Sequence, residues 1–251
     1  MLKIFLSLSL ATLFCLSAVA DEASVKEAIE EKLGNKVTSV TKSPYLGLYE
    51  VFAEGLIINT GQGLYTGQVF YTDEDVTALL VGPLIDTKTM KNVTAERMQK
   101  LTAINFSDLP LDLAVKQVHG NGKRVLATFE DPHCGYCKTL AKEIRSLEDV
   151  TIYTFLLPIL SPDSLEKSEQ IWCSADKAKA WQEWIIDGKA PTAKAANCDT
   201  GAIRKTIELG KKLAITGTPT IFFADGSRIP GAAPLAQIKI KLDQEPNNVE
   251  K

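Results

Sequence analysis

The chain has 251 residues, 45% of them hydrophobic, and a formal net charge of −3. This balance is typical of a globular protein with two modest domains, and it excludes the strongly basic surface that nucleic-acid binding requires. The residues that can carry redox or metal chemistry are few, namely five cysteines and two histidines.

The N-terminus has the features of a cleaved signal peptide. A positively charged start is followed by an apolar run from Ile4 to Leu16 and by small residues at Ala18 and Ala20. An anchor helix is the weaker interpretation, because the run is shorter than the roughly 20 residues that span a bilayer. We therefore expect residues 1–20 to be removed and the mature protein, from Asp21, to be exported to an oxidising compartment.

The first part of the mature chain predicts a helix and then a small antiparallel sheet. Ser24 to Glu27 resembles a capping box, and Gly34 would end the short helix. From Tyr45 to Leu84, β-rich segments alternate with glycine and Asn/Asp turns. The last expected strand, Val76 to Val81, is apolar, and edge pairing with a second copy of the chain would cover it. We therefore expect residues 21–84 to form a dimerisation domain.

The remainder of the chain predicts a linker and a larger domain. Asn92 to Ala103 indicates a connecting helix with Asn92 or Thr94 as its N-cap, so the linker should span residues 85–105. Residues 106–251 alternate strands and helices, which indicates mixed α/β packing around a central sheet. The expected elements are, in order, a strand at Val125–Phe129, a helix from Cys134, a strand at Thr151–Leu157, helices between Leu165 and Asp187, a helix at Ala202–Leu213, strands at Thr220–Phe223 and Arg228–Ile229, and a helix from Leu235.

The motif Cys134-Gly-Tyr-Cys137 lies between an expected strand and an expected helix, an arrangement typical of a dithiol redox centre. At a helix N-terminus, unpaired backbone N–H groups and the helix dipole favour the thiolate of Cys134, which is the attacking species. Cys137, one turn further along, would be shielded and placed to attack a mixed disulfide. The sequence therefore predicts a nucleophile followed by a resolving thiol.

Other interpretations of this cysteine pair are weaker. A zinc site needs about four ligands, usually with a second close pair, and the other cysteines and histidines are scattered. Haem attachment needs a histidine after the second cysteine, where Lys138 stands. An inert disulfide usually closes a longer loop. We therefore expect neither a metal nor an organic cofactor.

Removal of the leader leaves four cysteines, an even number that suggests two disulfides in an exported protein. Cys173 and Cys198 are far apart in sequence, and we interpret them as a structural bridge, with a second redox pair as the alternative.

Thr218-Pro219 is unusual before an apolar strand, because proline removes a donor from the sheet. A cis bond beside the redox pair would explain it, and an ordinary trans turn is the alternative.

Together these features resemble the bacterial periplasmic disulfide isomerases of the DsbC type, within the thioredoxin-like superfamily. The resemblance rests on Cys134-Gly-Tyr-Cys137, Ile171-Trp-Cys173, Cys198-Asp199, Gly217-Thr-Pro-Thr220 and Val93-Thr94. It implies an α+β fold with a small N-terminal antiparallel β dimerisation domain, a linker helix and a C-terminal thioredoxin-like domain with a helical insertion. It also implies a periplasmic, V-shaped homodimer whose two catalytic domains face an apolar cleft.

The resemblance also assigns candidate site residues. They are Cys134 as the nucleophile, Cys137 as the resolving thiol, Pro219 as the cis-proline with Thr218 modulating the redox behaviour beside it, Gly135, Tyr136 and His133 as further redox-modulating residues, and Cys173 with Cys198 as the structural disulfide.

The chain departs from thioredoxins proper in one respect. Their buried acid stands six residues before the first cysteine, where this chain has Thr128, so a proton relay through that position is absent. Glu130 and Asp131 are nearer to the motif, although such charges can simply be exposed in a loop. His133 could favour the Cys134 thiolate if protonated, but a solvent-facing turn residue is the preferred interpretation.

The expected function is isomerisation of wrong disulfides in exported proteins by thiol–disulfide exchange. The expected partners are misoxidised exported proteins, a second copy of the chain, and a membrane reductant of the DsbD type that keeps Cys134 reduced. The alternatives are a chaperone-type isomerase like DsbG, a monomeric thiol oxidase, and a holdase that uses the apolar cleft alone. The N-terminal extension and Thr218 argue against the oxidase.

Overall fold

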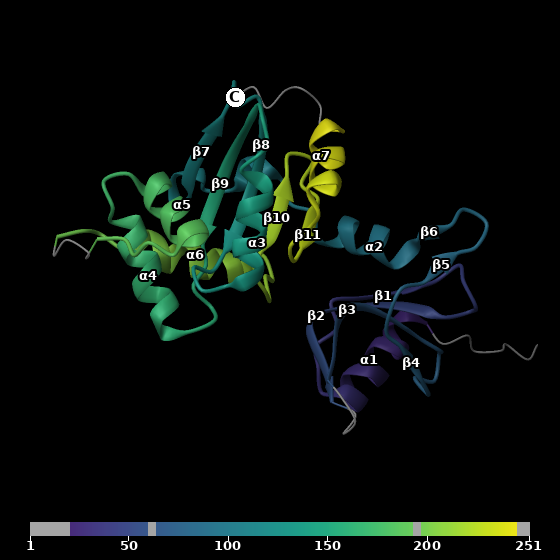
Figure 1. Cartoon of the computed structure of the whole chain (residues 1–251). Helices are drawn as coiled ribbons and strands as arrows, with labels where there is room; N and C mark the ends of the chain where they lie inside the picture. The colour runs from purple at the N-terminus through teal and green to yellow at the C-terminus, as the bar shows by residue number, and fades with distance from the viewer. Residues whose placement is uncertain (1–20, 60–63, 193–196, 245–251) are drawn as a thin grey trace, which may run out of the picture. The chain divides into compact units, whose positions relative to one another are not determined.

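The computed structural model describes residues 21–59, 64–192 and 197–244, so the expected signal peptide lies outside the described residues. The chain divides into two compact units, and the division falls between Gly82 and Pro83. Each unit has its own sheet and its own core (Figure 1). The helix expected in the linker is part of the second unit, and the domain boundaries expected from the sequence stay a prediction.

The first unit is a helix packed on a small antiparallel sheet. Its elements are α1 (Glu22–Leu33), β1 (Ser39–Lys42), β2 (Tyr49–Asn59), β3 (Leu64–Thr72) and β4 (Leu79–Leu80), and the strands follow one another in the sheet as β1-β2-β3-β4. The apolar face of α1 supplies Val25 and Ile29, both fully buried, to a core that includes Val51 and Phe70. The small sheet predicted from the alternating pattern is confirmed.

Local capping sets the two ends of α1. The N-cap is Asp21, whose Oδ1 accepts a hydrogen bond of 2.8 Å from the Ser24 backbone N–H. The expected capping box beginning at Ser24 is therefore wrong, because the preceding carboxylate already satisfies this N–H and Ser24 lies within the first turn. Gly34 ends the helix as predicted, with a left-handed φ of 67°.

The strand expected from Val76 to Val81 is wrong in its extent. Only Leu79–Leu80 pairs with β3, at the edge of the sheet. The carboxylate of Asp73 accepts from the Thr77 backbone N–H at 2.8 Å, and the Val76 N–H donates to the Asp73 carbonyl at 3.2 Å. These bonds form a turn, so the first half of the expected strand is not extended. The expected edge position is correct for the two residues that remain.

The second unit has a five-stranded sheet with helices on both faces. Its elements are β5 (Ile85–Asp86), β6 (Lys91–Asn92), α2 (Val93–Thr102), the 3-10 helices η1 (Phe106–Asp108) and η2 (Leu111–Leu113), β7 (Val115–His119), β8 (Arg124–Glu130), α3 (Gly135–Ile144), β9 (Val150–Leu156), α4 (Pro162–Trp172), α5 (Lys177–Asp187), α6 (Gly201–Lys212), β10 (Thr220–Phe223), β11 (Arg228–Pro230) and α7 (Leu235–Asp243). The strand order is β11-β10-β8-β9-β7, in which only β8 and β9 are parallel (Figure 1). The expected α+β fold with a helical insertion is confirmed.

Two local features refine the expected elements. The N-cap of α2 is Asn92, whose Oδ1 accepts from the Ala95 N–H at 2.9 Å, while the Thr94 hydroxyl accepts from the Leu84 N–H. The sequence did not predict β7, although its buried Val115 and Gln117 alternate with more exposed residues in the two-residue period of a strand. This strand pairs with β9 and forms the edge of the sheet on that side.

The central strand β8 is buried on both faces, and its alternation decides which side chains meet α3. Leu126 packs in one cluster with Leu140 of α3, whereas Phe129 packs on the other face against Phe155, with ring centroids 4.6 Å apart. Because side chains of a strand alternate between faces, Thr128 and Glu130 share the face of Leu126, which α3 covers. The carboxyl end of β8 therefore presents polar groups to the helix that carries the cysteine motif.

Candidate redox site

Cys134 stands at the N-terminal end of α3, as the sequence predicts. It is the N-cap of the helix, and its Sγ accepts a hydrogen bond of 3.4 Å from the Cys137 backbone N–H. The Sγ also donates to the Thr218 carbonyl oxygen at 3.2 Å. The Thr218–Pro219 bond is cis, the isomer that the sequence left open. Two segments 84 residues apart therefore meet at one sulfur atom.

The two cysteines of the motif differ in their contact with solvent. Cys134 is 6% exposed and Cys137 is fully buried, while Tyr136 between them is 72% exposed. Both are thiols in the structure. Burial raises the pKa of the Cys137 thiol far above its ordinary value, and the nearby negative charge of Glu130 raises it further. Cys137 is therefore protonated at neutral pH.

Glu130 is buried beside this pair. It is the last residue of β8 and has no exposed surface, and its Oε1 accepts a hydrogen bond of 2.7 Å from the Thr128 hydroxyl. Its Oε2 has no hydrogen-bond partner in the part of the chain that the structure describes. Burial raises the pKa of Glu130 to about 7, against the opposing effect of the Thr128 hydrogen bond. The interpretation of Glu130 as an exposed loop charge is wrong, because β8 continues through this residue and pairs it with Leu156.

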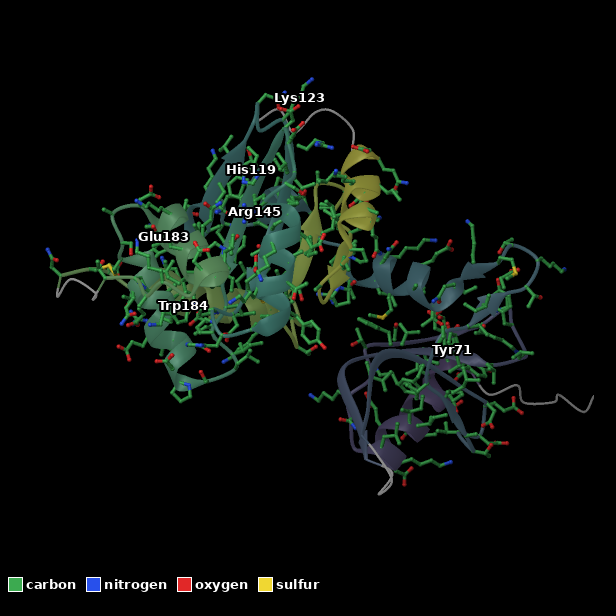
Figure 2. The ribbon with its side chains drawn as sticks, viewed as in Figure 1. Tyr71, His119, Lys123, Arg145, Glu183 and Trp184 are labelled. Carbon is green, nitrogen blue, oxygen red and sulfur yellow. A yellow bond between two sulfur atoms is a disulfide. The ribbon has the colours of Figure 1, made fainter. Side chains whose placement is uncertain are left out.

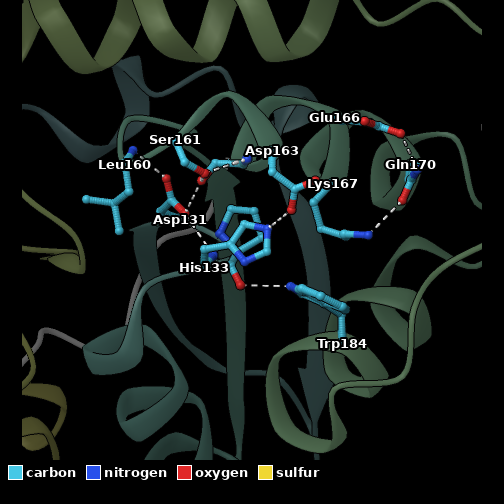
Figure 3. Close-up of polar contacts among 11 residues, drawn as sticks. Asp131, His133, Leu160, Ser161, Asp163, Glu166, Lys167, Gln170 and Trp184 are labelled. Carbon is cyan, nitrogen blue, oxygen red and sulfur yellow. Dashed lines mark hydrogen bonds and ion pairs between the residues drawn. The ribbon is translucent and has the colours of Figure 1, made fainter.

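Asp131 is also fully buried, and its carboxylate joins two loops. Oδ1 accepts from the His133 N–H and from the Ser164 hydroxyl, each at 2.8 Å. Oδ2 accepts from the backbone N–H groups of Ile159 and Leu160, at 2.8 and 2.9 Å (Figure 3). The exposed-charge interpretation is wrong here as well. The carboxylate fixes the turn before Cys134 to the segment that follows β9.

His133 lies at the surface, as expected for a turn residue, but its ring is held on two sides. Its Nε2 forms an ion pair with the Asp163 carboxylate from the start of α4. The ring packs edge-on against Trp184 of α5 with centroids 5.4 Å apart, and the Trp184 indole N–H donates to the Pro132 carbonyl at 2.7 Å (Figure 3). The helical insertion therefore orients the residue that precedes the nucleophile.

The remaining cysteines form the disulfide expected from the sequence. Cys173, at the C-terminal end of α4, is bonded to Cys198, and the two Cα atoms are 5.9 Å apart. The bridge closes a segment that contains α5, whose Trp181 is 2% exposed. Its structural role stays a prediction.

An open hollow lies between β7 and α5 and does not include the redox site. It is lined by Val118, His119, Arg145, Leu147, Lys179, Gln182, Glu183, Ile186 and Asp187, several of which Figure 2 labels. Its charges are of both signs, and the His119 Nδ1 lies 3.0 Å from the Leu147 carbonyl.

The described residues also include no group of three or more His, Cys, Asp and Glu side chains that could hold a metal ion. Among the same residues, no helix has the length and apolar character needed to cross a membrane. The site itself offers two sulfur atoms that can exchange between dithiol and disulfide, with a buried carboxyl group beside them.

Known proteins share both halves of this arrangement. Residues 16–95 match the disulfide bond isomerase protein N-terminal domain, and residues 111–245 match the thioredoxin-like domain. The probable thiol:disulfide interchange protein DsbC of Bordetella parapertussis is 46% identical over 220 residues, which cover 87% of this chain and 73% of the relative. The chain belongs to the DsbC family. The resemblance stated from the sequence is thereby confirmed.

Two further relatives support the assignment to the DsbC family. The thiol:disulfide interchange protein DsbC of Escherichia coli is 27% identical over 248 residues, 97% of each chain. The crystal structure of a disulfide interchange protein from Neisseria gonorrhoeae has a TM-score of 0.51 and 41% identity, and it covers 55% of this chain and 100% of the other. The chain is accordingly a thiol:disulfide oxidoreductase.

The sequence missed two site residues, Glu130 and Asp131, whose burial sets them apart from ordinary loop charges. One signal was present. Both residues directly continue the apolar run of β8, and a strand that extends by one residue carries Glu130 into the core. No comparable sequence signal indicates the partners of Asp131, which lie up to 33 residues away.

Proposed function

We propose that the protein is a periplasmic disulfide isomerase and reductase, which rearranges wrong disulfides in exported proteins through Cys134 and Cys137. The observation that carries the proposal is the asymmetry of these two thiols. Cys134 caps the helix and keeps a small exposed area, and Cys137 is fully buried one turn further on. This is the arrangement that a nucleophile and a resolving thiol require.

In the first step the Cys134 thiolate attacks a disulfide of the client protein. A bond forms between Cys134 Sγ and one client sulfur, the client disulfide breaks, and the second client sulfur leaves as a thiolate. The Cys137 backbone N–H at the start of α3 lies 3.4 Å from Cys134 Sγ and points at the attacking sulfur. In the thiol form, the Cys134 S–H donates to the Thr218 carbonyl oxygen at 3.2 Å and so fixes the direction of the sulfur before it loses its proton.

Two outcomes follow from this mixed disulfide. In isomerisation the released client thiolate attacks another client disulfide, and a client sulfur finally expels Cys134, so that no net electrons are transferred. In reduction Cys137 attacks Cys134 Sγ, the client leaves with both sulfurs reduced, and the protein keeps the Cys134–Cys137 disulfide. That disulfide must be reduced again, and we assign this to a membrane reductant of the DsbD type.

The surface around the motif suits an unfolded polypeptide client. Tyr136, Ile159, Leu160 and Leu165 are large apolar side chains that are at least 40% exposed. Asp131 binds the backbone of Ile159 and Leu160, so this apolar surface is held at a fixed place next to the motif. Exposed apolar groups of this kind bind client segments with little sequence preference.

The first unit is proposed to join two copies of the chain. Support comes from its match to the N-terminal domain of disulfide bond isomerases and from the short exposed edge strand β4. Residues 1–20 are proposed as the signal peptide that directs the protein to the periplasm. On this proposal residues 21–84 form the dimer, residues 85–105 connect, and residues 106–251 carry the chemistry.

Refolding of a scrambled multi-disulfide protein tests the proposal. The wild type should restore the native disulfides, Cys134→Ala should be inactive, and Cys137→Ala should retain isomerisation while accumulating mixed disulfides.

Alkylation of the reduced protein below pH 7 should label Cys134 before Cys137. A Cys134→Ala variant that still suppressed client aggregation but exchanged no disulfides would point to an added chaperone role. Oxidation of reduced clients without isomerisation would favour a thiol oxidase instead.

A further inference from the structure

The carboxyl end of β8 brings a buried acid and a buried thiol to the same place. Cys137, Leu140 and Ile144 form the buried stripe of α3, and Leu140 packs in one cluster with Leu126 of β8. Glu130 lies four residues along β8 from Leu126, on the same face of the sheet. Cys137 lies one turn from Leu140 toward the start of α3. Glu130 and Cys137 therefore lie at the same end of the interface between β8 and α3.

The packing around Leu156 shows that the two groups are near each other. Leu156 of β9 is the cross-strand partner of Glu130 and belongs to the same buried cluster as Cys137, and the charge of Glu130 raises the pKa of the Cys137 thiol. The other groups that face Glu130 are uncharged: the Thr128 hydroxyl of β8 and, 3.1 Å from it, the Thr154 hydroxyl of β9. The neighbouring β10 strand has no titratable residue. The Asp131 carboxylate is fully engaged with the loops described above.

The resolving step needs a proton acceptor at this place. Cys137 can attack Cys134 Sγ only as a thiolate, yet it has no exposed surface through which water could take the proton. A second negative charge beside an ionised Glu130 would be costly in a buried site. Transfer of the proton from the thiol to the carboxylate keeps the net charge of the pair at one negative charge, and so avoids that cost.

The hydrogen bonding of Glu130 leaves one oxygen for this purpose. Thr128 holds Oε1 at 2.7 Å and fixes the carboxylate. Oε2 is buried and has no partner among the described residues. An unpartnered buried oxygen is costly to maintain and calls for an explanation, and a proton that arrives on Oε2 during the reaction provides one.

We propose that Glu130 accepts the Cys137 thiol proton on Oε2 when Cys137 resolves the mixed disulfide, an inference that rests on the proposed function. The S–H bond of Cys137 breaks and an O–H bond forms on Glu130. The Cys137 thiolate then forms the bond to Cys134 Sγ, and the client sulfur leaves with the electron pair of the broken disulfide. The client thiolate takes its proton from solvent. When the Cys134–Cys137 disulfide is reduced again, Glu130 returns its proton to Cys137.

The test separates the two cysteines in time. Reduced protein in excess is mixed with an aromatic disulfide whose thiolate product absorbs visible light. Attack by Cys134 releases the first thiolate, and attack by Cys137 releases the second. We expect Glu130→Gln to leave the first phase unchanged and to slow the second by about 100-fold near neutral pH. In the wild type the rate of the second phase should rise through pH 7, following the pKa of Glu130 of about 7, and this inflection should be absent from Glu130→Gln.

Matched variants keep the outcome unambiguous. Glu143→Gln removes an exposed carboxylate from α3 and should behave as the wild type in both phases. Glu130→Asp keeps a carboxylate and should keep the inflection at a reduced rate, which a merely structural role of Glu130 does not explain. Carbon NMR of the Glu130 carboxyl group in the wild type gives a readout independent of activity, with an expected midpoint near pH 7.

Three results would overturn the inference alone: an undiminished second phase with its inflection in Glu130→Gln, an equal slowing of both phases, or a Glu130 carboxyl that titrates near its ordinary value. If the wild-type protein shows no first phase, the proposed function fails and this inference fails with it.

Discussion

The two units of the chain differ in what they bury. The core of the first unit is apolar, and the polar residues buried there among the described residues are Ser43 and Thr72. The second unit buries two adjacent carboxyl groups, Glu130 and Asp131, at the end of its central strand. A buried carboxyl group costs stability unless it is hydrogen-bonded or paired with an opposite charge. The candidate redox chemistry lies where the second unit buries its charge, and the first unit is proposed above to join two copies of the chain.

The largest expected effect concerns association of two copies through the first unit. Leu80 is 43% exposed on the two-residue edge strand β4. We expect Leu80→Lys to convert a dimer to a monomer, because a lysine on the edge opposes strand pairing, and to abolish isomerisation of a large client. Light scattering measures the first effect and refolding the second.

The control for this prediction is Leu46→Lys, which adds the same charge at a loop residue that is 79% exposed. It should leave the dimer intact. A Leu80→Lys protein that remains dimeric would place the interface elsewhere in the molecule.

The second unit should depend strongly on Asp131. Asp131→Asn replaces a carboxylate that accepts four hydrogen bonds by an amide that presents donors to some of the same N–H groups. We expect the free energy of unfolding to fall by about 4 kcal/mol, since each buried donor left unpaired costs about 1–3 kcal/mol. Urea unfolding followed by tryptophan fluorescence measures this. An unchanged midpoint would contradict the stabilising role of the Asp131 hydrogen bonds.

The Cys173–Cys198 bridge should contribute somewhat less. Replacement of both residues by alanine should lower the free energy of unfolding by about 3 kcal/mol in the chain-entropy model, while thiol exchange at Cys134 is retained. Calorimetry and the exchange assay are the measurements. Loss of exchange in a protein that stays folded would show that the pair takes part in the redox chemistry, which is the alternative interpretation.

Glu130 should make the stability of the second unit fall as the pH rises. Its pKa is raised from 4.5 to about 7 in the folded protein, so the folded state holds a proton that the unfolded state has lost. This contribution is fully present below pH 4.5 and is lost as the pH rises through about 7. Between pH 5 and pH 8 the wild type should lose roughly 2–3 kcal/mol more unfolding free energy than Glu130→Gln. Urea unfolding at both pH values measures the difference. If the stabilities of the two proteins changed equally with pH, the raised pKa of Glu130 would be contradicted.

Much of the fold could be predicted from local signals. Gly34 ends α1, Asn92 caps α2 and Cys134 begins α3, because caps depend on residues three or four positions away. The strands around the motif follow from short apolar runs. The error at Val76 came from a turn held by the Asp73 side chain, which hydrophobic pattern alone does not report.

The site was predicted only in part. The motif itself predicted the positions of its two cysteines. The even number of cysteines in the mature chain predicted the pairing of Cys173 with Cys198. The environment of Glu130 does not follow from the sequence, because its burial results from packing of α3 over the end of β8. Nor does the ion pair of His133, whose partner Asp163 lies at the start of α4.

The amino-acid sequence by itself determined most of the element order, though not β7, and it determined the place of the cysteine motif at a helix start and the chemistry of its sulfurs, since these depend on neighbouring residues. Only the tertiary structure decided the cis form of Thr218–Pro219, the hydrogen bond from Cys134 to the Thr218 carbonyl, and the burial of Glu130 and Asp131. The physical reason is that burial and hydrogen-bond partners are set by segments distant in the chain. The charge of a carboxyl group in a sequence does not report whether water or protein surrounds it.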